Sequence, residues 1–319
     1  MGFMLCTFAA FYYLAELAAA ESGRRPEKIR FSLLKFAGAS VAGAGFAGIT
    51  LIPGIAAVSR TAAAEKAGTG LSGVYGDIWK QLGALCEDSL SFVKSGDQGD
   101  VNLYCGCAVL LFAGIYFLNK EIRTAEKIVT GILIVLYFAG IHITALNLLF
   151  HGLHKPVGIP NRFVFILIFL LLKMSCDAWG NVENESTGRI FAGLIAAEGF
   201  CIVVGIKSGN IWGLLLTAGV LAVFFLVMWT ERCICGKLSG HAFCCVEIRK
   251  LGCLVLAVLI LAETGIHGIV SITDNGTANR DIYVESEQEV CGLLESAGVD
   301  QVDYRAAIVN PLVRNEEML

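Results

Sequence analysis

The chain has 319 residues, of which 56% are hydrophobic and 16% are charged, and its formal net charge is −4. Soluble domains carry about 25% charged and about 45–50% apolar residues, so this composition excludes an ordinary soluble protein. The small net charge provides no broad basic surface, and we therefore expect no nucleic-acid partner.

Long, continuously apolar runs predict an all-α protein whose helices cross a membrane about eight times. A membrane-spanning helix needs about 20 mostly apolar residues, whereas the strands of a membrane barrel would alternate apolar and polar residues. The spans form one predicted helical bundle over residues 1–272. We predict them at 2–20, 31–52, 101–118, 128–149, 163–179, 190–206, 211–229 and 251–272.

Lysine and arginine gather in the connectors 21–30, 119–127 and 230–250. With eight spans these three connectors fall on one side, and the positive-inside rule assigns that side to the cytoplasm. The long loop 53–100 and the polar tail then lie outside the cell. This predicts a multi-pass protein of the plasma membrane with an extracellular C-terminal tail.

The outer loop 53–100 contains a predicted amphipathic helix. Ile78, Leu82, Leu85 and Phe92 fall near one face of a helix, with charged residues elsewhere. Such a helix lies on the outer membrane surface. The alternative is a helix that caps the bundle.

The polar tail 273–319 predicts the start of an extracellular α/β or β domain that continues beyond this chain. Residues 285–298 have helical spacing and end in glycine. The stretch "VDYRAAIV" at 302–309 is typical of a strand.

A short connector between two predicted spans carries unusually many titratable side chains. It reads "HGLHKPVGIPNRF" and includes His151, His154, Lys155 and Arg162. A phosphate at this point would meet the point charge of lysine and the bidentate fork of arginine, and histidine donates a hydrogen bond or moves a proton. The alternative is anchoring, because basic side chains at the ends of spans commonly reach lipid headgroups.

Ionisable residues inside spans are candidates for function. Glu263 and His267 are four positions apart in the last span, so they share a helix face in its outer half. The alternative is a buried, hydrogen-bonded packing role. Lys173 and Asp177 have the same spacing near the cytoplasmic end of their span, where we expect a simple ion pair.

The last cytoplasmic connector contains a cluster of sulfur and imidazole side chains, "CICGKLSGHAFCC". Four of these side chains would suffice to coordinate a zinc ion, but their spacing is not that of a standard zinc finger or zinc ribbon. The alternative is a set of reduced, small packing residues. The candidate ligands are Cys233, Cys235, His241, Cys244 and Cys245.

Four stretches, in the same order, resemble the bacterial YfhO family of membrane proteins. "HGLHKPVGIPNRFVFILIFLLL" is similar to the family's aromatic-HGF stretch, its prolines and its YRFSF-like entry into the next helix. "GFMLCTFAAFYYL", "VNLYCGCAVLLFAGIYFLNKEIRTAEK" and "DYRAAIVNPLVRNEEML" resemble three further family stretches. Phe150, Asn161 and Val164 depart from the usual residues, whereas His151 and Arg162 match.

The resemblance implies a GT-C-type glycosyltransferase architecture. Such a protein would use a polyprenyl-phosphate sugar as donor and glycosylate a cell-envelope polymer such as teichoic acid at the outer face. The usual catalytic carboxylate of this superfamily lies in its first outer loop, so we expect it upstream of Met1 and expect this chain to be a central fragment. The resemblance establishes no cofactor and leaves a requirement for a divalent metal open.

Within this hypothesis the connector residues His151, His154, Lys155 and Arg162 contact the donor phosphate. Glu263 orients a sugar hydroxyl or one of the histidines. Two other functions remain open, a lipid-sugar flippase or transporter and a non-catalytic membrane assembly subunit.

Overall fold

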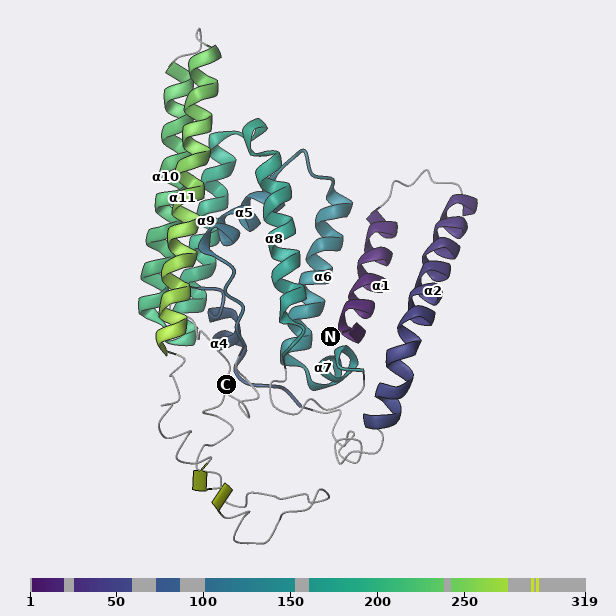
Figure 1. Cartoon of the computed structure of the whole chain (residues 1–319). Helices are drawn as coiled ribbons and strands as arrows, with labels where there is room; N and C mark the ends of the chain where they lie inside the picture. The colour runs from purple at the N-terminus through teal and green to yellow at the C-terminus, as the bar shows by residue number, and fades with distance from the viewer. Residues whose placement is uncertain are drawn as a thin grey trace.

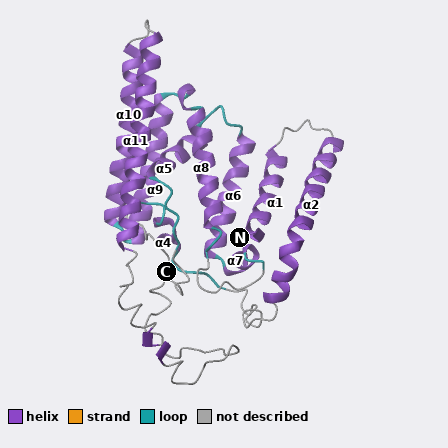
Figure 2. Ribbon diagram, viewed as in Figure 1, coloured by secondary structure: helices purple, strands orange, loops and turns teal. Residues whose placement is uncertain are grey.

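The described part of the protein is helical. The computed structural model describes residues 2–19, 26–58, 73–86, 101–152, 161–237, 242–274, 288–289 and 291–292. Figure 2 shows helices joined by loops over this part of the chain, which confirms the predicted all-helical class there. The elements are α1 (Gly2–Ala19), α2 (Pro26–Val58), α4 (Ile78–Gly83), α5 (Cys107–Leu118), α6 (Thr124–His142), α7 (Thr144–Phe150), α8 (Val164–Gly180), the 3-10 helix η1 (Val182–Asn184), α9 (Thr187–Ser208), α10 (Ile211–Lys237) and α11 (Ala242–Asp274).

Five stretches among the described residues are long and apolar enough to cross a membrane. They are Ile29–Thr50, Thr124–His142, Thr187–Ser208, Ile211–Lys237 and Cys244–Thr273. Each of the eight predicted spans coincides largely with helix, but the number that crosses the bilayer remains a prediction.

Helix α5 lies at the centre of the bundle and packs against α8, α9 and α10. Its Leu111, Ile115 and Tyr116 side chains are fully buried. Two glycines allow α5 and α9 to approach closely, since a Cβ atom on Gly114 would lie 2.6 Å from the carbonyl oxygen of Gly193. Close contact between small residues is a common way of joining helices in a membrane.

The two ends of the bundle differ in their connectors (Figure 1). Helices α4 and α7 lie at one end, which we call the α7 end. The α5–α6 connector and η1 lie at the other, which we call the η1 end, and there α10 and α11 extend beyond the other helices.

The predicted span 128–149 is wrong in one respect, because it is two helices rather than one. Helix α6 ends at His142, and the chain turns at Ile143 before α7 begins. Residues of the outer loop pair with backbone groups at this break. The Tyr75 N–H donates to the His142 carbonyl at 2.7 Å, and Val74 forms a β-bridge with Ile143. Burial at this junction raises the pKa of the Tyr75 hydroxyl.

The predicted span 101–118 also needs correction. Residues 101–106 are not helical, and α5 begins only at Cys107. Twelve helical residues reach about 18 Å, which is short of the roughly 30 Å core of a bilayer. Val101 and Leu103 in the non-helical segment are buried, as non-helical backbone at membrane depth must be, unless it lines a water-filled cavity.

The predicted amphipathic helix of the outer loop is the six-residue α4 in the described part of the chain. Asp77 caps it by accepting from the Trp79 N–H at 2.8 Å. Gln81 is buried and donates to the Tyr75 carbonyl at 2.7 Å. Helix α4 packs against α9, which favours the capping interpretation. Phe92 and nearly all of the predicted extracellular domain after residue 273 lie outside the described residues.

Candidate functional site

The described ends of the α7–α8 connector are held together by buried hydrogen bonds. His151 lies at the end of α7, where its Nδ1 contacts the Asn147 carbonyl at 2.8 Å. The Asn147 side-chain amide donates to Asn161 Oδ1 at 2.9 Å, across the connector. The His151 ring also packs edge-on against Phe163, with 5.6 Å between ring centroids. These contacts bring His151 beside the turn that starts α8.

Arg162 lies in that turn. Its neighbours Asn161 and Phe163 are buried, whereas Arg162 is exposed. Phe163 is the N-cap of α8, so Arg162 directly precedes a helix N-terminus, where negative charge is stabilised. The other two predicted phosphate ligands, His154 and Lys155, lie outside the described residues.

A second polar group surrounds Glu263 on α11. Its carboxyl oxygen Oε1 accepts hydrogen bonds from the Tyr104 hydroxyl and from the backbone N–H of Cys107, each at 2.5 Å. Cys107 is the first residue of α5, so Glu263 occupies the N-terminus of this short helix. Only 7% of the Glu263 surface is exposed.

His267 belongs to the same group. Its ring stacks on Tyr104 with 3.9 Å between centroids and 27° between planes. Because Tyr104 contacts both Glu263 and His267, the prediction that these two residues share a helix face is confirmed.

The second carboxyl oxygen of Glu263 is in a different situation. Oε2 is buried and has no hydrogen-bond partner among the described residues. Gly106 lies beside the carboxyl group with φ +99°, and a Cβ atom there would come within 3.8 Å of Oε1. Glycine adopts this backbone conformation without strain.

The two polar groups are separate in the fold. Figure 1 shows α7 and α11 on different sides of the bundle. This separation argues against the idea that Glu263 orients His151.

Sequence reasoning missed several residues of both groups. Tyr104 and Cys107 fall inside the predicted span 101–118, and Asn147 carries no signal of a role. The glycine in "YCGC" was the one sequence feature that could have suggested a break before α5.

The cysteine cluster has no metal-binding arrangement among the residues that the structure describes. Cys235 and Cys245 face each other across α10 and α11, with each Sγ 3.6–3.7 Å from the other's carbonyl oxygen. Both line a cavity of about 580 Å³ at the η1 end, together with Arg232 and Arg249. His241, one of the candidate zinc ligands, lies outside the described residues.

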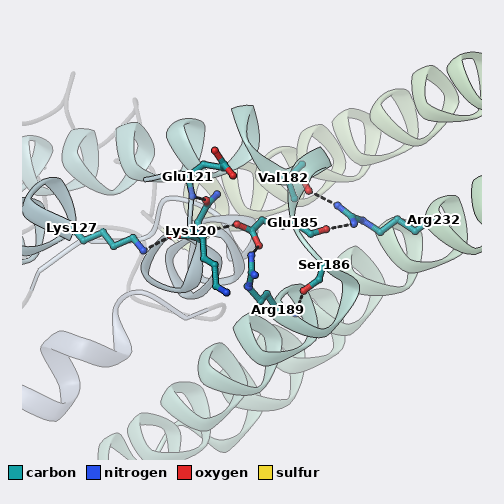
Figure 3. Close-up of polar contacts among 9 residues, drawn as sticks. Lys120, Glu121, Lys127, Val182, Glu185, Ser186, Arg189 and Arg232 are labelled. Carbon is teal, nitrogen blue, oxygen red and sulfur yellow. Dashed lines mark hydrogen bonds and ion pairs between the residues drawn. The ribbon is translucent and has the colours of Figure 1, made fainter. Parts of the chain in front are cut away.

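A network around Glu185 joins the connectors at the η1 end (Figure 3). The buried carboxylate accepts from the Lys120 N–H at 3.0 Å and pairs with Arg189. The Arg232 guanidinium donates to the Glu185 carbonyl at 2.5 Å and to the Val182 carbonyl. The α5–α6 connector, the α8–α9 connector and helix α10 are thereby tied together, which indicates a structural role.

Lys173 and Asp177 form the ion pair that their spacing predicted. The Nζ and Oδ2 atoms are 2.7 Å apart on successive turns of α8. Both side chains are about one-third exposed, so the pair contributes at most modestly to stability.

The comparisons with known proteins identify a family. The family model described as "Bacterial membrane protein YfhO" matches residues 1–318. No curated protein and no solved structure matches the chain. The resemblance carried by the α7–α8 connector and the three other stretches is therefore confirmed.

Proposed function

The chain belongs to the YfhO family of bacterial membrane proteins, and from this premise we propose that it serves in glycosyl transfer at the outer face of the membrane. The donor is a polyprenyl-phosphate sugar, and the acceptor is a cell-envelope polymer such as a teichoic acid. Membership of this family and several apolar helices place the protein in the membrane as a multi-pass chain.

The observation that carries this proposal is the folded α7–α8 connector. The Asn147–Asn161 hydrogen bond and the His151–Phe163 contact hold its ends together, and the exposed residue Arg162 directly precedes the N-cap of α8. A guanidinium fork next to a helix N-terminus is well suited to a phosphate. His154 and Lys155 of the same connector are further proposed ligands of this phosphate.

The charge distribution supports the proposed orientation. Lys120, Arg123, Lys127, Arg189 and Arg232 belong to the connectors and helix ends at the η1 end. The positive-inside rule favours a cytoplasmic η1 end. The α7 end, with the phosphate ligands, then faces outward, and the C-terminal tail is extracellular.

The proposed chemistry assigns a binding role to these residues. An acceptor hydroxyl attacks the anomeric carbon, the bond between that carbon and the phosphate oxygen breaks, and the lipid phosphate leaves. Its negative charge grows as the bond breaks, and Arg162 stabilises that charge in the transition state. The acceptor proton passes to a general-base carboxylate, a role that we assign by family analogy.

The test is Arg162→Ala in the complete protein, reconstituted with a labelled polyprenyl-phosphate hexose. A charge-assisted hydrogen bond is worth about 1.5–3 kcal/mol, so we expect kcat/KM for the donor to fall roughly 10- to 100-fold. Arg162→Lys should restore part of the loss. Lys80→Ala is the matched control, because Lys80 is an exposed cation on α4 at the same end. Unchanged transfer in Arg162→Ala would refute the proposal.

A lipid-sugar flippase or transporter is the second candidate. It is favoured by the division of residues 101–118 into a buried non-helical segment and the half-length α5, since interrupted helices commonly line transport sites. Movement of the sugar lipid between leaflets without its consumption would favour this function. An assembly subunit would show neither transfer nor movement.

A further inference from the structure

Helix α5 begins inside the bundle, and Glu263 occupies its N-terminus. The first N–H groups of a helix have no intrahelical partner, and here the Cys107 N–H donates to Glu263 Oε1 at 2.5 Å. The Tyr104 hydroxyl donates to the same oxygen. One oxygen of the carboxyl group is thus fully engaged.

The other oxygen lacks a donor. Oε2 of Glu263 is buried without a hydrogen-bond partner in the described part of the chain, although a carboxylate oxygen accepts about two hydrogen bonds. Buried polar atoms are nearly always paired, and each exception calls for an explanation. A bound ligand that donates a hydrogen bond to Oε2 would explain this exception.

The surroundings restrict the kind of donor. The N-terminus of α5 carries the positive end of the helix dipole, which disfavours a cation at the same carboxyl group. The ligand group must therefore donate a hydrogen bond to Oε2 and must not be a cation. A neutral hydroxyl group meets both requirements. The Tyr104–His267 stack, at 3.9 Å between centroids, holds a neighbouring donor in place, so the site is preorganised.

We propose that Glu263 Oε2 binds a hydroxyl group of a polyhydroxylated ligand, and that Glu263, Tyr104 and His267 form a hydroxyl-recognition site inside the bundle. The proposal rests on the proposed function for the identity of the ligand. The hydroxyl belongs either to the sugar of the lipid donor or to the polyol of the acceptor. In both cases Glu263 is a specificity-determining residue.

The experiment compares Glu263→Gln with the wild type, using the complete protein in lipid nanodiscs. Glutamine keeps an acceptor oxygen for the Cys107 N–H but presents an amide donor where the ligand hydroxyl would donate. We expect KM to rise roughly 10- to 100-fold for one substrate only, as for loss of a hydrogen bond to a charged group. The substrates are polyprenyl phosphates carrying glucose, galactose or N-acetylglucosamine, and oligomers of glycerol phosphate or ribitol phosphate.

The matched controls separate binding from folding. Thr264→Ala changes the next residue of α11, which is exposed and bonded only within its own helix by the contacts that the structure gives, and should leave both KM values unchanged. Glu263→Asp keeps a carboxyl group, so it provides a second variant if Glu263→Gln does not fold. We expect an intermediate KM for it.

The outcomes distinguish the two proposals. Unchanged KM values in Glu263→Gln, or a loss confined to kcat, would overturn the hydroxyl site. If the wild type transfers no sugar, the proposed function fails, and direct binding then tests the site alone. Wild-type protein should bind a glycosylated lipid phosphate or a polyol phosphate more tightly than bare polyprenyl phosphate, and Glu263→Gln should abolish that preference. Absence of any preference in the wild type overturns the inference.

Discussion

The carboxyl group of Glu263 accepts a hydrogen bond from the backbone N–H of Cys107, a residue 156 positions earlier in the chain. This bond connects the last described long helix, α11, to the first turn of the central helix α5. It supplies an acceptor for a backbone donor that the start of α5 leaves inside the bundle.

Gly106→Ala should destabilise the protein. Gly106 precedes α5 with φ +99°, a conformation that costs a residue with a side chain about 1–3 kcal/mol. The measurement is the free energy of unfolding of the reconstituted protein. Gly219→Ala on α10 is the control, because a Cβ there meets nothing within 4 Å. Equal stabilities for the two variants would contradict the described geometry before α5.

Gly114→Ala should separate α5 from α9. The added Cβ would lie 2.6 Å from the Gly193 carbonyl oxygen, and overpacking of this kind costs about 1–3 kcal/mol. Thermal unfolding in detergent measures the loss. Gly199→Ala is the control, because Gly199 lies on α9 and a Cβ there meets nothing within 4 Å. Its effect on stability should be close to neutral. A stable Gly114→Ala variant would show that the two helices do not approach as described.

Glu185→Ala should cost more stability than Glu183→Ala. The buried Glu185 carboxylate accepts from the Lys120 N–H and pairs with Arg189, so its loss should cost about 1–3 kcal/mol. Glu183 pairs with Arg249, but the two side chains are 61% and 46% exposed, and exposed pairs contribute about 0–1 kcal/mol. Denaturant unfolding compares the variants, and similar losses would refute the structural role of Glu185.

Alkaline phosphatase fusions should report the orientation of the bundle. The enzyme needs disulfides that form outside the cytoplasm. A fusion after Gly209, in the α9–α10 turn next to α4, should be active. A fusion after Asn119, in the α5–α6 connector, should be inactive. The reverse pattern would place the α7 end in the cytoplasm and remove the basis for donor binding at the outer face.

Much of the helical architecture was predictable, because apolar runs must be helical where they meet lipid. The two interruptions were not predictable by the same reasoning. Residues 101–118 and 128–149 are mostly apolar, and hydropathy does not distinguish a continuous helix from one whose backbone groups are paired with another segment. The break at Ile143 depends on the outer loop, since Tyr75 donates to the carbonyl of His142.

The candidate sites likewise depend on contacts between residues that are far apart in the sequence, which local patterns do not reveal. The position of Glu263 inside a span identified it from the sequence, and its spacing identified His267. Their partner Tyr104 comes from a segment 159 positions away from Glu263, and no local pattern links the two. The sequence likewise indicates Arg162 but gives no sign of the Asn147–Asn161 bond that holds its connector.

The helices differ greatly in length across the bundle. Helix α8 has 17 residues and α11 has 33, which correspond to about 26 Å and about 50 Å. A bilayer core of roughly 30 Å is thicker than α8 and much thinner than α11. Helix α11 is one of the five candidate spans, and its first turns carry Glu247, Arg249 and Lys250, so we expect these turns to extend past the hydrocarbon core. The pair of α10 and α11 therefore reaches into water at the η1 end, where the other described helices end first.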